Sequence, residues 1–228
     1  MQILRFWRIV LAIALGGILM YLAFFRLPPR PRPTQLLENN WITSTLCSAP
    51  CWEALEPGAT HYLDLQQRLA QNTRVTLRGP NELARQSVST LPPNTVLLFA
   101  RATGTDQGHL MFDYDARGAP SVLYEIALYP HPAMTLDETI GWFGYPSAYR
   151  FQQVNFETPQ LYYLLLYYAQ PRMEVRTSAI KVVNGRWDII WSQPILQVSY
   201  LSPQAYASSA HGCWWRSLKV LSKECSLW

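Results

Sequence analysis

Charged residues are scarce in this chain, making up 15% of its 228 residues. Apolar residues make up 49%. This composition excludes a disordered chain, because disorder needs low hydrophobicity together with high net charge. The length is enough for one to one-and-a-half domains with a buried core.

A concentrated basic surface is also lacking. The formal net charge is +4, but residues 1–33 hold five arginines and no acidic residue. The rest of the chain carries 14 basic and 15 acidic groups. Binding to nucleic acid through counterion release needs clustered cations, so we expect no nucleic acid partner.

Catalytic motifs are absent: there is no G-x-S-x-G, no H-E-x-x-H and no glycine-rich phosphate loop. Residues 113–118 resemble half of a calcium loop, but Arg117 stands at a ligand position and the closing Glu is missing, which favours a β-turn. Lone histidines are usually surface or satisfied core residues. The four here are scattered through the chain: His61, His109, His131 and His211. We therefore predict no catalytic, cofactor-binding or metal-binding residue and no cofactor.

One long uncharged run is present, at residues 9–25 (IVLAIALGGILMYLAFF). At about 1.5 Å per residue it just spans a bilayer core when the flanking Arg and Trp side chains reach the interface. The exit sequence, Phe-Phe-Arg-Leu-Pro-Pro, offers no small-x-small cleavage site and no nearby cysteine for lipidation. We predict a cytoplasmic stub and an uncleaved transmembrane anchor in residues 1–26. A stiff Pro/Arg-rich linker follows in residues 27–33.

Four cysteines form two local sets, Cys47 with Cys51 and Cys213 with Cys225. Arginines flank both ends of the apolar run, so the positive-inside rule leaves the orientation open. We favour two disulfides, which would place residues 34–228 outside the cytoplasm, although the pairing stays open. The competing interpretations are a zinc site that includes His211 and a reactive thiol at Cys213.

The pattern of residues 34–228 predicts an extracytoplasmic α+β domain. One helix is expected from Thr60, as its cap, to about residue 70. A second begins with a capping box of Thr135 and Glu138 and ends at Gly144-Tyr-Pro146. Strands are expected at residues 95–101, 109–114, 121–129, 161–168, 173–183, 186–191 and 195–201. Turns are expected at Gly118 and at Asn184-Gly185, and a further helix within the tail.

This order predicts two helix-plus-antiparallel-meander units, about residues 47–130 and 131–202, followed by a tail at 203–228. The aromatic run 161–168 (LYYLLLYY) leaves two interpretations open. Core packing on both faces of a central strand is one. The other is an exposed aromatic face for partner contacts, with additions from the C-terminal tryptophans Trp214, Trp215 and Trp228.

Two local patterns resemble a known layout. Pro57-Gly58-x-Thr60 with its helix, and Thr135-x-x-Glu138 through Gly144-x-Pro146 before a hairpin, resemble the SmpA/BamE-like unit of bacterial envelope proteins. Pro50-Cys51-Trp52 is similar to uncharacterised bacterial membrane-anchored proteins that carry Pro-Cys-Trp at this point. The likeness covers about half of the chain and implies an α+β fold and an envelope location. It supplies no catalytic residues, and the lipid-attachment Cys of the outer-membrane assembly lipoproteins is missing.

The sequence as a whole therefore predicts a single-pass membrane protein whose extracytoplasmic domain binds a protein partner, or acts as an envelope scaffold, without catalysis. Its partners would be the membrane, through residues 9–25, and a protein. One alternative is a membrane-tethered hydrolase or a thiol or metal enzyme using Cys213 and His211. Another is an accessory subunit of a larger membrane complex, in which Gly16-Gly17 lets the anchor approach another helix closely.

Overall fold

The computed structural model describes residues 41–42, 44, 46–70, 72–78, 95–101, 104–131, 133–154, 160–183, 186–210 and 213–214. All of them belong to Pro33–Trp228, the second of two compact units into which the chain divides. The predicted anchor, the linker, the Asn184-Gly185 turn, His211 and Cys225 lie outside the described residues. Within the described ranges, no helix is long and apolar enough to cross a membrane.

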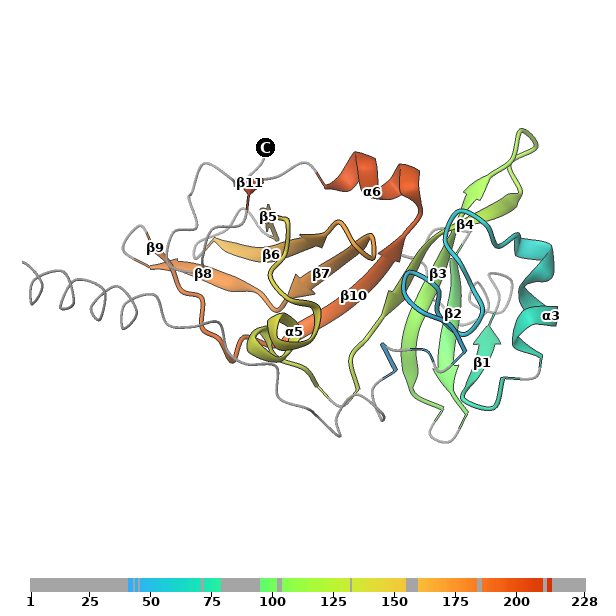
Figure 1. The fold of residues 1–228 in the computed structure, drawn as a ribbon, viewed down its shortest axis with the longest axis horizontal. Coiled ribbons are helices and arrows are strands. Elements are labelled where there is room, and N and C mark those ends of the chain that lie inside the picture. The colour runs from blue at the N-terminus through green and yellow to red at the C-terminus, as the bar shows by residue number, and fades with distance from the viewer. Residues whose placement is uncertain are drawn as a thin grey trace, which may run out of the picture. The chain divides into compact units, whose positions relative to one another are not determined.

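The fold of the described residues is α+β with an antiparallel sheet and few helices, which confirms the predicted fold class (Figure 1). The helical elements are η1 (Tyr62–Asp64), α3 (Leu65–Leu69), α5 (Leu136–Phe143) and α6 (Pro203–Ser209). The strands of the N-terminal half are β1 (Val75–Arg78), β2 (Thr95–Ala100), β3 (Asp106–Tyr114) and β4 (Pro120–Leu128). Those that follow are β5 (Ala148–Gln153), β6 (Leu161–Tyr168), β7 (Met173–Thr177), β8 (Ile180–Val183), β9 (Arg186–Trp187), β10 (Ile195–Leu201) and β11 (Cys213–Trp214).

The strands run across the sheet in the order β1-β2-β3-β4-β10-β7-β6-β5-β11, and the β8–β9 hairpin joins through β6. Strands β1 to β4 form a first meander, and β5, β6, β7 and β10 form a second. Their last strands, β4 and β10, lie side by side and antiparallel (Figure 1). We call this pair the seam. Its register runs from Val198 opposite Leu128 to Leu201 opposite Glu125.

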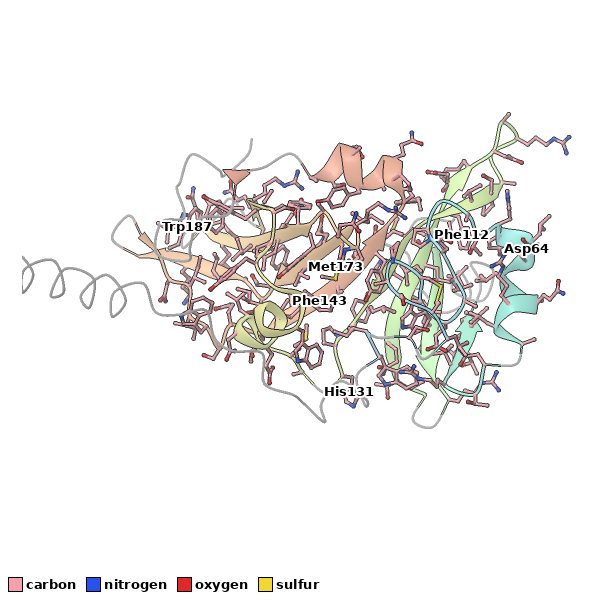
Figure 2. All side chains as sticks on the ribbon, in the orientation of Figure 1. Asp64, Phe112, His131, Phe143, Met173 and Trp187 are labelled. Atoms are coloured by element: carbon pink, nitrogen blue, oxygen red, sulfur yellow. A yellow bond between two sulfur atoms is a disulfide. The ribbon has the colours of Figure 1, made fainter. Side chains whose placement is uncertain are left out.

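One face of the sheet carries the apolar core, because alternate residues of each strand point to it. On β10, Val198 and Tyr200 belong to the core, whereas Ser199 points to the opposite face, which we call the polar face. Figure 2 labels Phe112 in the first meander and Met173 in the second, and both are fully buried. The helices add their own buried residues to the same apolar cluster: Leu65, Leu69, Leu136 and Ile140.

Helix α5 begins and ends where the sequence predicts. Thr135 is its N-cap, and the backbone N–H of Thr135 donates to Glu138 Oε2 at 2.8 Å in the predicted capping box. At the other end, Gly144 has a φ of 76° and donates its N–H to the carbonyl of Ile140. Glycine adopts this conformation without steric cost, so the helix ends there.

The predicted cap of the first helix is wrong. The helical segment begins at Tyr62 with His61 as its cap, and no side chain caps it. Thr60 Oγ1 instead accepts a hydrogen bond from the backbone N–H of Glu56 at 2.8 Å. The carbonyl of Thr60 accepts from the N–H of Leu123 on β4 at 2.8 Å. Thr60 therefore ties the preceding turn to the sheet.

The predicted strands differ from the observed ones where hydrogen bonding to neighbouring segments, and not the local sequence, sets the limits of a strand. Residues 173–183 divide into β7 and β8, which pair with different stretches of β6. The predicted strand 186–191 shortens to β9, because the following loop hydrogen-bonds to the start of α5 instead. Strands β1 and β5 were not predicted. Both are short, and their strand character comes from pairing with β2 and β6.

Candidate functional site

The segment before η1 forms a compact corner closed by a disulfide. Cys47 and Cys51 are bonded, with their Cα atoms 5.8 Å apart, so the structure contains the local pairing, one of those that the sequence left open. The side chain of the next residue, Trp52, is fully buried and donates from Nε1 to the carbonyl of Trp41 at 2.5 Å. The disulfide loop therefore fixes an aromatic residue in the core. We call residues 41–55 the disulfide corner.

A tight turn follows the disulfide. Trp52 and Leu55 exchange two backbone hydrogen bonds of 2.8 Å, and the residues between them, Glu53 and Ala54, have φ values of 50° and 64°. Positive φ at both central residues is the pattern of a type I′ turn, where Asn and Gly are preferred. Because neither residue is glycine, the turn stores backbone strain of about 1 to 3 kcal/mol per residue.

The strained turn points a carboxylate inward. Glu53 is 2% exposed, and its Oε1 lies 2.7 Å from Nη1 of Arg74. Its Oε2 accepts from Asn72 Nδ2 at 2.7 Å. The guanidinium of Arg74 also lies 4.7 Å from the centre of the Trp41 ring. Glu53 is thus paired on both oxygens, which suits a structural role better than a chemical one.

A second corner displays apolar side chains. Ile190 is 54% exposed, and Trp191 and Leu196 are each 44% exposed. The loop is fixed to α5, because the N–H of Leu136 donates to Gln193 at 2.9 Å and that of Asp137 to Trp191 at 3.0 Å. The loop that carries Ile190 and Trp191 is therefore held against α5, and Leu196 lies on the following strand, β10. We call Ile190, Trp191 and Leu196 the apolar corner.

Two carboxyl groups lie on the polar face at the seam. Glu125 on β4 accepts at Oε1 from Ser199 Oγ at 2.8 Å and from Gln197 Nε2 at 3.3 Å. Glu174 on β7 is 12% exposed at its side chain, and its Oε1 lies 3.5 Å from Nη2 of Arg176. Burial raises the pKa of both carboxyls above their ordinary value, and the Arg176 guanidinium opposes this.

The pKa values of two nearby tyrosines on the polar face are also raised. Burial, with a smaller contribution from Glu125, raises the pKa of Tyr124 to about 12. Burial, with a smaller contribution from Glu174, also raises the pKa of Tyr167. Tyr167 stands opposite Glu174 in the β6–β7 pair. The polar face around the seam therefore carries a partly buried group of titratable side chains.

The alternative enzyme site is only partly described. The backbone of Cys213 lies in β11 and pairs with Tyr149 of β5. The Cys213 side chain, His211 and Cys225 lie outside the described residues. In the described part of the chain, no three His, Cys, Asp or Glu side chains gather as metal ligands. The zinc and thiol interpretations therefore stay predictions.

The other predicted candidates have local structural contacts. His61 pairs through its backbone with Val122, whereas His109 Nδ1 lies 3.0 Å from the Tyr129 hydroxyl. His131 is exposed beyond the end of β4. In the half calcium loop, Asp115 Oδ1 accepts from the backbone N–H groups of Arg117 and Ala119, at 2.8 and 2.9 Å. This carboxylate closes a β-turn, as the favoured interpretation predicts.

The aromatic run on β6 packs inside the protein. Tyr167 and Tyr168 are 0% and 2% exposed, although they point to opposite faces of the sheet. Tyr162 is half-buried against the core, edge-on to Trp187 with ring centres 4.9 Å apart. The prediction of packing on both faces is confirmed, and the exposed aromatic face is wrong for this strand. Among the described residues, large exposed aromatic side chains lie elsewhere, at Tyr114, Tyr145 and Trp191.

Sequence reasoning missed Glu53 as a buried carboxyl and Glu125 and Glu174 as partly buried ones. A signal existed for Glu125, because it stands alone among apolar residues in SVLYEIALY. A charged residue inside an apolar strand is rarely buried without polar neighbours. No comparable signal marks Glu53, whose burial depends on the turn conformation.

Comparison with known proteins gives no match: no protein-family model, no curated protein and no solved structure matches this chain.

Proposed function

We propose that this protein is a single-pass membrane protein whose extracytoplasmic α+β domain acts as a binding or scaffold module without catalysis. In this proposal residues 9–25 anchor the chain in the cell membrane, and the domain meets a protein partner. The observation that carries the proposal is the Cys47–Cys51 bond. Structural disulfides persist in oxidising compartments and are rare in the cytoplasm, so the bond favours an external domain.

Labelling of intact cells with a membrane-impermeant thiol reagent tests the location. Cysteine-containing peptides are then mapped by mass spectrometry, with and without prior reduction. We expect Cys47 and Cys51 to label only after reduction. Labelling that requires cell lysis, with Cys47 and Cys51 free, would contradict the external location. Free Cys213 thiol in the same experiment would favour the alternative thiol or metal enzyme, which also involves His211.

The apolar corner supports the binding function. Trp and large aliphatic side chains held on a rigid backbone are typical of contact sites, where a few central residues carry most of the binding energy. Here Ile190, Trp191 and Leu196 lie within seven residues of one another and are each 44% exposed or more. Because the loop is hydrogen-bonded to α5 and Leu196 lies on β10, little backbone ordering is needed on binding.

Site-specific crosslinking in cells tests this surface. A photo-crosslinking amino acid replaces Trp191 in one strain and Tyr114 in another. Tyr114 is a matched control, because it is 48% exposed but lies at the end of β3. We expect one discrete crosslinked protein at position 191, lost when Ile190 and Leu196 are changed to Ser. Identical adducts at both positions would contradict a specific contact.

The likeness to envelope proteins with SmpA/BamE-like units stays a proposal that rests on the sequence motifs. Each meander is preceded in the chain by a helix, and both helices contribute to one apolar cluster. The Pro50-Cys51-Trp52 motif lies at the disulfide and anchors Trp52 in the core. These features suit a rigid scaffold placed at a membrane.

A further inference from the structure

Two aspartates stand beside the exposed side chains of the apolar corner. Ile190 is 54% exposed and Trp191 44% exposed, and they are neighbours in the loop between β9 and β10. Asp137 adjoins them, because its backbone N–H donates to the carbonyl of Trp191 at 3.0 Å. Asp188 precedes Ile190 by two residues, and both aspartates are exposed. Exposed carboxylates and exposed apolar side chains therefore share this surface.

The loop turns Asp188 and Ile190 outward together. Both residues are exposed, whereas Ile189 between them packs against the apolar core. This alternation places Asp188 and Ile190 on the outer side of an extended segment. The N–H of Asp188 donates to the carbonyl of Lys181 on β8 at 2.9 Å, which ties the segment to the neighbouring hairpin.

Basic side chains do not neutralise the two aspartates within the described ranges. Residues 187–196 and α5 contain no Lys or Arg. The ion pairs among the described residues are Glu53 with Arg74 and Glu174 with Arg176, so neither includes Asp137 or Asp188. The apolar corner is therefore rimmed by negative charge.

Helix stability accounts for only part of this charge. Asp137 and Glu138 lie in the first turn of α5, where carboxylates interact favourably with the helix dipole. Both also contact the Thr135 hydroxyl, Asp137 Oδ1 at 2.6 Å and Glu138 Oε2 at 2.8 Å. Asp188 lies outside any helix, and its side chain makes no hydrogen bond to the described residues. A structural role of this kind does not explain Asp188.

We propose that the apolar corner binds a segment of a partner protein in which a large apolar residue is flanked by Lys or Arg. The apolar residue of the partner packs on Ile190 and Trp191, and its basic neighbours pair with Asp137 and Asp188 at the rim. An apolar centre with a charged rim is the usual layout of a contact site. This inference rests on the proposed function, because it specifies the partner of the same surface.

The sign of the charge selects this occupant over two others. A second copy of the chain that docks through the same patch around a twofold axis brings Asp137 and Asp188 close to their own counterparts. Anionic lipid headgroups are repelled by the same carboxylates. Like charges brought together at an interface weaken binding, whereas a basic segment satisfies the carboxylates and covers the apolar side chains.

Photo-crosslinking from Ser192, in the cells that naturally make the protein, tests the inference. Ser192 is exposed and follows Trp191, so a photo-crosslinking residue at this position leaves the apolar corner intact. The crosslinked peptide is sequenced by tandem mass spectrometry. We expect a segment of another protein with Lys or Arg next to the attachment point. An attached lipid, a second copy of this chain, or a segment without a neighbouring Lys or Arg would overturn the inference.

Salt and charge variants test the aspartates directly. In membranes isolated from the same cells, we expect the yield of the crosslinked product to fall at least about threefold between about 50 and about 500 mM NaCl. Asp137→Asn together with Asp188→Asn should lower the yield at low salt by a similar factor and remove the salt dependence. Asp113→Asn, at an exposed position on β3, is the matched control and should change neither.

A Trp191→Ala variant separates failure of this inference from failure of the proposed function. We expect it to abolish the crosslinked product. If it does so while salt and the aspartate substitutions have no effect, binding at the apolar corner stands and the basic partner is refuted. No crosslinked product, or one that is indifferent to Trp191→Ala, would refute binding at this surface altogether. The salt dependence with both aspartates present decides the inference even if the double variant does not fold.

Discussion

The two meanders share an order of elements but are stabilised by different kinds of contact. In the first, the helix α3 has five residues and no side-chain cap, and the disulfide corner supplies a covalent bond and a buried ion pair. In the second, α5 has eight residues and a capping box, and Phe151 stacks on Trp187 with ring centres 3.7 Å apart. Figure 2 labels Trp187 and Phe143 in this half.

The difference shows how a short helix can be kept in a fold. One turn of helix is unstable by itself, because nucleation costs more than its few hydrogen bonds return. The first meander holds α3 through neighbours: Arg68 of the helix donates to the carbonyl of Ala54, in the turn of the disulfide corner, at 3.1 Å. We expect stability to be concentrated in few contacts in the first meander and spread over many in the second.

The largest loss should follow Glu53→Ala, which leaves Arg74 and Asn72 without their carboxylate partner. We expect about 2 to 3 kcal/mol of lost unfolding free energy, because Asn72 is left buried without its acceptor and the partly exposed Arg74 loses its carboxylate. Denaturant unfolding of the full chain measures it. Glu56→Ala, an exposed glutamate three residues away, is the control and should cost less than about 0.5 kcal/mol. Equal effects of the two substitutions would mean that the ion pair does not hold the corner.

Removing the disulfide should lower the unfolding free energy by less than Glu53→Ala does. The double substitution Cys47→Ser with Cys51→Ser opens a very short loop, and chain entropy then predicts a loss of about 2 kcal/mol. Hydrogen exchange should show the loss in the β1–β2 amides and not in the β5–β6 amides. Ser48→Ala in the same loop serves as the control. A loss spread evenly over both meanders would argue against a local role for the bridge.

Removing the N-cap of α5, in the second meander, should lower the unfolding free energy by a smaller amount. Thr135→Ala removes the hydroxyl of the capping box and should cost about 1 kcal/mol, the usual value of an N-cap. Thr73→Ala, at an exposed position outside the sheet, should change stability by less than about 0.5 kcal/mol. Thermal unfolding of both variants measures the difference. A cost above that of Glu53→Ala would reverse the comparison between the meanders.

Relief of backbone strain in the turn of the disulfide corner should change the unfolding free energy least. This change should be stabilising. Ala54→Gly places glycine at a φ of 64°, so we expect a gain of about 0.5 to 1 kcal/mol. The same substitution in the exposed part of α6, Ala207→Gly, should cost up to about 1 kcal/mol. Opposite signs for these two changes in thermal unfolding would support a strained turn. A loss at both positions would show that Ala54 is unstrained.

Local patterns were sufficient to predict several elements. The α5 boundaries follow from Thr135, Glu138 and Gly144, because a capping box and a positive-φ glycine act within a few residues. Strands β6 and β10 match their predicted ranges, since continuous apolar and β-branched residues mark buried strands. By contrast, β1 and β11 form only because neighbouring strands lie beside them.

The sequence by itself determined the α+β class and the antiparallel strands, because hydrophobic period and turn chemistry are short-range properties, whereas it left the pairing of the cysteines open. Tertiary structure alone decided the joining of two meanders through β4 and β10, and with it the position of Glu125 and Glu174 on either side of one strand. It also decided that Trp191 is exposed while Tyr167 is buried. Burial and charge proximity depend on which distant segments meet, and at the seam Gln197 and Glu125 meet although they are 72 residues apart in the chain.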